Sequence, residues 1–155
     1  MKLRIITLRQ STVREVGAVE KIYLERLKHA AKVELVDIKP ESGRAKSSLA
    51  ALKEDGKRIL EKVDENGPVV VLDSGGRSLT SEALADWLKV SLNHGSKSIS
   101  FIIGSAEGLD EEVKKRANLK LKISDLTLPH QLVRLILLEA LYRSFDILGP
   151  KRYHK

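Results

Sequence analysis

The sequence predicts an α/β fold in which helices cover both faces of a mainly parallel sheet of five strands. Five short runs rich in β-branched residues alternate along the chain with longer segments whose apolar residues recur at helical spacing. Such alternation is typical of right-handed strand–helix–strand units, whose strands lie parallel in one sheet. The length of 155 residues fits a single domain over residues 1–155.

The first two strands are predicted at residues 3–8 and 33–38. Residues 3–8 are a short β-prone run, and residues 33–38 alternate apolar and polar side chains. Between them, residues 13–32 carry apolar side chains three or four positions apart, which indicates an amphipathic helix. Pro40 and Gly43 then interrupt regular structure. A second helix follows, marked by Leu49, Leu52, Ile59, Leu60 and Val63.

Two central strands are predicted at residues 68–72 and 98–103, because both runs are dense in β-branched side chains. The segment between them has helical spacing, and Ser81 is its predicted N-cap. The apolar positions of this helix are Ala83, Leu84, Trp87 and Leu88.

The last part of the chain contains two predicted helices and one strand. Asp110 is expected to cap a short helix that ends near Arg116, and residues 119–123 form the last strand. Proline is favoured at the first position of a helix, so Pro129 is expected to open a final helix that runs to about Leu148.

Composition limits the possible functions. The formal net charge is +7 and both ends of the chain are basic, which favours binding to a polyanion, although many basic proteins bind no nucleic acid. Because cysteine is absent and the four histidines lack ligand spacing, we expect no metal site. The apolar run at the N-terminus is too short for a signal peptide or a membrane span, so we expect a cytoplasmic protein.

Three unusual loops follow the third, fourth and fifth predicted strands, at residues 73–77, 104–108 and 124–128. Ligands bind at the edge where the carboxyl ends of parallel strands meet. Two of the loops contain glycines, whose backbone groups can approach a ligand closely. Neither a Walker loop nor a G-x-G-x-x-G motif occurs. The loops therefore predict a nucleoside-like ligand held by backbone contacts, with ordinary turns as the alternative.

The final helix is apolar nearly all round, whereas a surface helix shows one apolar stripe. We expect a second copy of the chain to cover it in a two-fold homodimer, with a neighbouring helix or loop as the alternative. Arg143 is a polar exception that either pairs with Glu139, four residues earlier, or faces a ligand. His130 lies at the helix start, where the dipole disfavours an imidazolium, so a neutral ring is expected.

Three separated motifs and the chain ending resemble one family over the whole length. The segments are Ile103-Gly104-Ser105-Ala106-Glu107-Gly108-Leu109, Leu126-Thr127-Leu128-Pro129-His130-Gln131-Leu132-Val133-Arg134, Glu139-Ala140-Leu141-Tyr142-Arg143-Ser144-Phe145 and Tyr153-His154-Lys155. In this order and spacing they resemble the large-subunit ribosomal RNA pseudouridine N3-methyltransferases of the SPOUT superfamily.

The resemblance implies a homodimer of single SPOUT-like domains, each with a C-terminal trefoil knot that forms the S-adenosyl-L-methionine pocket. It further implies methylation of a pseudouridine at ring N3 in large-subunit ribosomal RNA, with the large subunit or the assembled ribosome as partner. By position, the cofactor contacts would be Leu72, Gly104, Ser105, Ser124, Asp125, Leu126, Thr127, Leu128 and Pro129.

The C-terminal tail, residues 149–155, is basic and lacks acidic residues. Its match to the family ending implies that it folds over the methyl donor, within one subunit or across the dimer. Arg143, Tyr153 and His154 are then the candidate catalytic residues. They would contact the target base and either accept the imide proton or stabilise the resulting anion.

Ser105 stands where the family usually has a second glycine, and this departure raises the alternative of weaker cofactor binding. One alternative function is a SPOUT methyltransferase for another ribosomal or transfer RNA base. Another is a ribosome-binding relative that has lost catalysis, which Ser105 alone supports. A flavodoxin-like nucleotide-binding module is disfavoured, because residues 9–12 make no convincing phosphate cradle.

Overall fold

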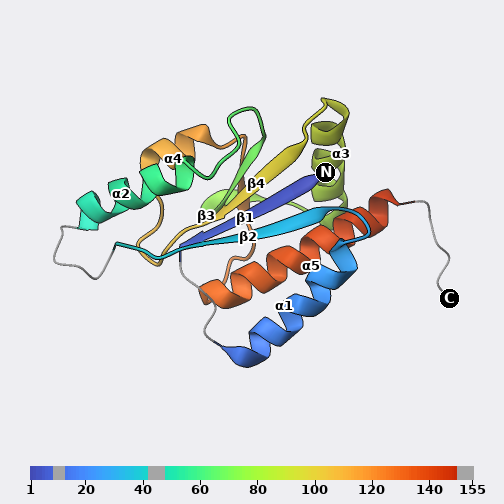
Figure 1. Ribbon diagram of the computed structural model, residues 1–155, viewed down its shortest axis with the longest axis horizontal. Coiled ribbons are helices and arrows are strands. Elements are labelled where there is room, and N and C mark those ends of the chain that lie inside the picture. Colours follow the sequence, from blue (N-terminus) through green and yellow to red (C-terminus); the bar gives the residue numbers. More distant parts are fainter. Residues whose placement is uncertain (9–12, 42–47, 150–155) are drawn as a thin grey trace.

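The computed structural model describes residues 1–8, 13–41 and 48–149, in which five strands form one sheet (Figure 1). The sheet has the order β2-β1-β4-β3-β5, and all four neighbouring pairs are parallel, which confirms the predicted fold class. The strands are β1 (Lys2–Leu8), β2 (Lys32–Ile38), β3 (Val69–Ser78), β4 (Ser98–Ile103) and β5 (Leu119–Lys122).

Helices cover both faces of this sheet, as predicted (Figure 1). On one face α5 packs between α1 and α3, and on the other α2 packs against α4. The helices are α1 (Arg14–Leu27), α2 (Ser48–Leu60), α3 (Ser81–Asn93), α4 (Glu111–Arg116) and α5 (His130–Leu148).

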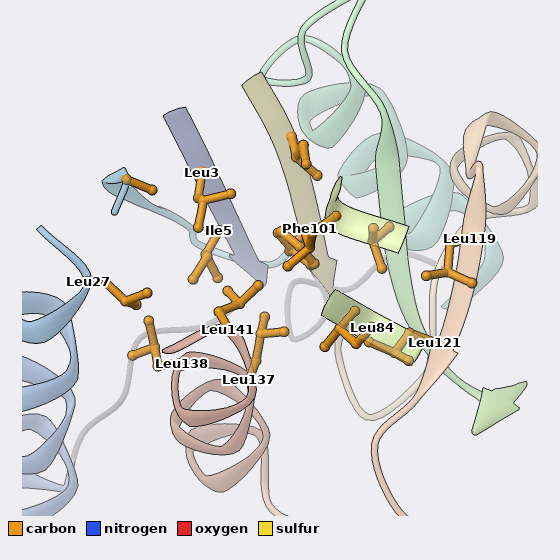
Figure 2. Packing of buried hydrophobic residues seen from close by; sticks show 14 of the residues in the cluster. Leu3, Ile5, Leu27, Leu84, Phe101, Leu119, Leu121, Leu137, Leu138 and Leu141 are labelled. Atoms are coloured by element: carbon orange, nitrogen blue, oxygen red, sulfur yellow. The ribbon is translucent and has the colours of Figure 1, made fainter. Parts of the chain in front are cut away.

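Two cores form because successive strand side chains point to opposite faces of the sheet. Figure 2 shows the core on the three-helix face, where Leu137 and Leu141 of α5 lie near Ile5 and Phe101 of the central strands. These four side chains have no exposed surface. The apolar side chains of α5 that face the sheet therefore anchor this helix.

The core on the two-helix face is smaller. Ile6 and Ile102 point toward it from the central strands, and Ile59 of α2 and Val113 of α4 cover them. Gly56 of α2 lies so close to α4 that an added Cβ would come within 2.7 Å of the Asp110 side chain. Close packing of small residues thus completes this layer.

Several predicted boundaries were wrong by a few residues. Thr80, not Ser81, caps α3, because its hydroxyl accepts a hydrogen bond from the backbone N–H of Ala83 at 3.1 Å. Pro129 is the N-cap of α5 and not its first helical residue. The prediction of Asp110 as a cap is confirmed, since its carboxylate accepts from the N–H of Glu112 at 3.0 Å.

Two further expectations concern the whole chain. The trefoil knot that the resemblance implies stays a prediction. Among the helices of residues 13–41 and 48–149, none is long and apolar enough to cross a membrane.

Candidate functional site

A cavity of about 580 Å³ lies at the carboxyl ends of β3, β4 and β5, where the three unusual loops meet. The sheet order places these three strands side by side, so loops far apart in sequence form one wall. The lining residues are Leu72, Asp73, Ser74, Ile103, Gly104, Ser105, Ala106, Gly108, Leu109, Lys114, Leu121, Lys122, Ile123, Ser124, Asp125, Leu126, Thr127, Leu128, His130 and Val133.

The first loop is a bulge within β3 and not a turn after it. Leu72 and Arg77 both pair with Leu121 of β5, so the residues between them protrude from the ladder. A Cβ on Gly76 would come within 2.6 Å of the carbonyl oxygen of Lys120, so a side chain there would force the two backbones apart. The prediction that β3 ends at Leu72 was wrong, because pairing resumes beyond the bulge.

The second loop, residues 104–108, turns sharply after β4. Gly104 is buried, and a Cβ there would lie 2.7 Å from Cγ of Leu109 and 2.9 Å from the carbonyl oxygen of Gly108. Gly108 closes the loop at a φ of 95°, a conformation that favours glycine. Ser105 donates a hydrogen bond to the Glu107 carboxylate at 2.9 Å. The Ser105 side chain therefore holds the loop together.

The third loop joins β5 to α5. The hydroxyl of Ser124 accepts a hydrogen bond from the backbone N–H of Leu126 at 2.9 Å. The Leu126 side chain is 77% exposed at the rim of the cavity, whereas Thr127 and Leu128 lead toward the helix. The carbonyl oxygen of Pro129 then accepts the first bonds of α5, from Leu132 and Val133 at 2.9 and 3.1 Å. This loop and the first helical turn form one side of the cavity.

Two lysines add positive charge to the cavity wall. Lys114 of α4 donates to Glu111 at 2.9 Å, and this hydrogen bond raises the pKa of Lys114 above its ordinary value. Lys122 of β5 forms an ion pair with Asp125. Besides these two lysines and the carboxylates of Asp73 and Asp125, the lining is mainly apolar side chains and backbone.

Most of the predicted cofactor residues lie together. Eight of the nine line the cavity, and Pro129 lies directly behind them as the N-cap of α5. The eight are Leu72, Gly104, Ser105, Ser124, Asp125, Leu126, Thr127 and Leu128.

Of the three predicted catalytic residues, the structure describes only Arg143, which does not line the cavity. Arg143 is exposed near the other end of α5 and donates to Glu139 at 2.7 Å, which raises the pKa of Arg143. Tyr153 and His154 lie outside the described residues, as does the loop at residues 9–12. Among the described residues, the structure thus forms a ligand cavity that Arg143 does not line.

Sequence reasoning missed several wall residues. Leu109 and Val133 belong to the quoted motifs and could have been inferred from them, whereas nothing in the local sequence distinguishes Lys114 from its neighbours. His130, for which a neutral ring at the helix start was expected, also lines the cavity.

The geometry fits a nucleoside-like ligand. Gly104 and Gly108 line the cavity, and because glycine has no side chain their backbone groups border it directly. Leu72, Ile103 and Leu109 supply apolar surface. Within residues 1–8, 13–41 and 48–149, no group of three or more histidines and carboxylates could hold a metal ion.

Comparison with known proteins gives a consistent family. A family model described as "Predicted SPOUT methyltransferase" matches residues 1–154. A protein named ribosomal RNA large subunit methyltransferase H from Oenococcus oeni is 39% identical over 86% of this chain and 86% of its own length. Proteins of the same name from Bacillus cytotoxicus and Christiangramia forsetii are 40% and 35% identical, over 86% and 99% of both chains respectively.

Proposed function

This chain belongs to the SPOUT methyltransferase family, and from that premise we propose that it methylates ring N3 of a pseudouridine in large-subunit ribosomal RNA. S-adenosyl-L-methionine is the proposed methyl donor. The observation that carries the proposal is the single cavity wall formed by the bulge in β3 and the loops after β4 and β5, on which eight of the nine residues matching the family's cofactor positions lie. The site of action is the large subunit or the assembled ribosome, in the cytoplasm.

The cavity suits the proposed donor in size and chemistry. Its volume of about 580 Å³ lies within the range of pockets for small molecules. Gly104 and Gly108 would offer backbone groups to the donor, and Leu72 and Leu128 would supply apolar contacts. Bound there, S-adenosyl-L-methionine would supply an electrophilic methyl group. The chain's own contribution is orientation, exclusion of water and control of charge.

The target nitrogen carries a proton at neutral pH, so a group of the protein must accept it or stabilise the anion. We assign this task to Arg143, Tyr153 and His154. Arg143 is permanently charged, which suits it to stabilising an anion but not to accepting a proton. His154 is the better proton acceptor, because an imidazole titrates near neutral pH.

The short sequence distance between the end of α5 and Tyr153 and His154 suggests that these two residues serve the cavity of a partner subunit. The cavity lies at the start of α5, and the tail begins beyond its end. A helix of 19 residues is about 28 Å long. Six residues, 150–155, reach about 21 Å even when fully extended. Tyr153 and His154 lie within this stretch, so they are too near the end of α5 in sequence to reach the cavity of their own chain.

A two-fold dimer through α5 would solve this problem. An axis perpendicular to α5 lays two copies of the helix antiparallel, so the end of one lies beside the start of the other. α5 is flanked by α1 and α3, yet Ile136 and Ile147 on its outer side remain 38% and 41% exposed. These apolar side chains would be covered in the dimer.

Complementation between two inactive variants tests the proposal. Deletion of residues 151–155 should abolish methylation of ribosomes while calorimetry still detects S-adenosyl-L-methionine binding. Gly104→Val should abolish binding while the tail remains intact. Mixed dimers should recover activity, because one cavity and one tail then meet across the interface. Full activity of the deletion variant would contradict the proposed tail function, and absence of rescue would contradict the shared site.

Mapping of methylated nucleotides identifies the substrate. Mass spectrometry of ribosomal RNA from cells with and without the protein should show one methylpseudouridine that depends on it. A methyl group on another ribosomal or transfer RNA base would favour another SPOUT specificity. No changed nucleotide would favour a ribosome-binding relative without activity.

A further inference from the structure

A buried ion cluster lies one helical turn from the cavity. Arg134 of α5 donates two hydrogen bonds to Glu20 of α1, each 2.8 Å long, and a third of 2.8 Å to Asp37 of β2. The side chains of Arg134 and Glu20 are 6% and 5% exposed, and that of Asp37 is 24% exposed. We call these three residues the Arg134 cluster. It joins three elements that are far apart in sequence.

The Arg134 cluster fixes the orientation of the guanidinium group and stabilises its positive charge. Both oxygens of Glu20 are engaged, so the planar guanidinium is held in one orientation. Burial of Arg134 opposes its charge, but the hydrogen bonds and attraction to Glu20 and Asp37 outweigh that effect and raise its pKa. Replacement of a buried ion pair by apolar residues is often neutral or stabilising. Stability alone is therefore a weak reason for such a cluster.

The start of α5 lacks two restraints that helix starts commonly have. Its N-cap, Pro129, makes no side-chain hydrogen bond, and no acidic residue occurs in the first turn. Such caps and charges normally fix the first turn of a helix. Of residues 130–136, only Arg134 is fully buried.

The later part of α5 is held differently. Leu137, Leu138 and Leu141 are completely buried in the core of the three-helix face (Figure 2). These contacts fix the axis of the helix beyond its second turn. The first turn carries the cavity residues His130 and Val133; Val133 packs against the border of the same core, and the adjacent Arg134 adds buried polar contacts to α1 and β2.

We infer that the Arg134 cluster is a positioning device for the cofactor loop, residues 124–129. By fixing the first turn of α5 against α1 and β2, Arg134 holds the end of this loop in its binding conformation before the cofactor arrives. A preordered loop loses less conformational entropy on binding, so affinity is higher. The inference rests on the proposed function in that it takes the cavity as the S-adenosyl-L-methionine site.

Three variants separate positioning from ordinary stabilisation. Arg134→Met removes every bond of the cluster and keeps most of the side-chain volume. Arg134→Lys keeps the charge but not the two-pronged contact. Asp55→Asn is the matched control, because Asp55 is also a buried carboxylate, 2% exposed, that pairs with an arginine, Arg58 of the same helix α2.

Two measurements on the full-length protein decide the question. Hydrogen exchange of the cofactor-free protein should show at least tenfold faster exchange at residues 126–132 in Arg134→Met, and calorimetry should show at least tenfold weaker S-adenosyl-L-methionine binding. Arg134→Lys should be intermediate. Asp55→Asn should lower the melting temperature and leave both measurements within twofold of the wild type.

The inference can still be tested if a variant does not fold or if the proposed function is wrong. If Arg134→Met does not fold, Glu20→Gln should show the same two effects at about threefold. A lower melting temperature with unchanged exchange at residues 126–132 overturns the inference. If the wild type binds no S-adenosyl-L-methionine, the proposed function is wrong, and the exchange of the cofactor-free protein still decides whether Arg134 positions the loop.

Discussion

The parallel strands all begin at one edge of the sheet, the amino edge, and end at the opposite one, the carboxyl edge. Different kinds of contact build these two edges. At the amino edge, side chains close the turns: Arg116 donates to the carbonyl oxygens of Asp64, Glu65 and Gly67 at 3.2, 2.9 and 2.9 Å. At the carboxyl edge, backbone groups and glycines surround a cavity. The amino edge uses its polar groups to join neighbouring segments, whereas the carboxyl edge leaves space between them. We therefore expect changes at the amino edge to affect stability and changes at the carboxyl edge to affect binding.

The largest effect is expected at Gly104, on the carboxyl edge. Gly104→Val adds a branched side chain at a position where even a single Cβ would lie 2.7 Å from Cγ of Leu109 and 2.9 Å from the carbonyl oxygen of Gly108. We expect at least a 100-fold loss of S-adenosyl-L-methionine affinity, which is about 2.7 kcal/mol, by calorimetry. Gly75→Ala on the same edge is the control, since its Cβ would meet only Asp73 at 3.6 Å. Equal losses in both variants would contradict the prediction.

The next effect is expected at Arg116, on the amino edge. Arg116→Met leaves three carbonyl groups without this donor, and we expect the free energy of unfolding to fall by about 2 kcal/mol in urea denaturation. Cofactor affinity should stay within twofold. Lys115→Met, which removes one exposed pair with Glu112, should leave the free energy of unfolding unchanged within experimental error. A clear loss of cofactor affinity in Arg116→Met would contradict the expectation that changes at the amino edge affect stability and not binding.

Ser105 offers a smaller test of the carboxyl edge. Because its hydroxyl bonds to Glu107 and holds the loop, Ser105→Gly should weaken cofactor binding by about twofold to threefold through greater loop freedom. Ser105→Ala separates the hydroxyl from the backbone effect. Tighter binding by the glycine variant would instead support the view that serine impairs the site.

The smallest effect concerns acid stability at the amino edge. The hydrogen bond from Ser98 at 2.6 Å, followed by that from the N–H of Asn66, lowers the pKa of Asp64 below its ordinary value of 3.8. The stabilisation is present above pH 3.8 and lost as the pH falls through the lowered pKa. Asp64→Ala should lower Tm by about 2 °C at pH 6 and by less at pH 3, in thermal melts. An equal shift at both pH values would contradict this assignment.

Much of the fold could be predicted from sequence because the signals were local. The β-branched runs gave the strands, and apolar spacing gave the helices to within a few residues. The extension of β3 to Ser78 could not be predicted in this way. It depends on pairing between Arg77 and Leu121, which are distant in sequence. The strand order also depends on such distant contacts.

The residues of the site and its surroundings likewise include some that local sequence reveals and some that only distant contacts reveal. The glycine-bearing loops and the stretch from Ser124 to Leu128 could be located from motifs and from the rule that ligands bind at the carboxyl edge. Glu20 could not be identified, because its partner Arg134 lies 114 residues away. A carboxylate within an amphipathic helix ordinarily faces solvent, and only the fold reveals that this one is buried.

The position of β1 between β2 and β4 in the sheet has a consequence for synthesis on the ribosome. β1 is made first, yet one of its two partners is β4, with Lys2 opposite Ser98. At typical translation speeds of about 5 to 20 residues per second, the two strands are made on the order of 5 to 20 seconds apart. During that interval, β1 has only β2 as a strand partner, and the backbone N–H and C=O groups on its other side remain unpaired. The nascent chain therefore depends on rapid burial once β4 emerges, and its slow folding step should be the closing of this long loop.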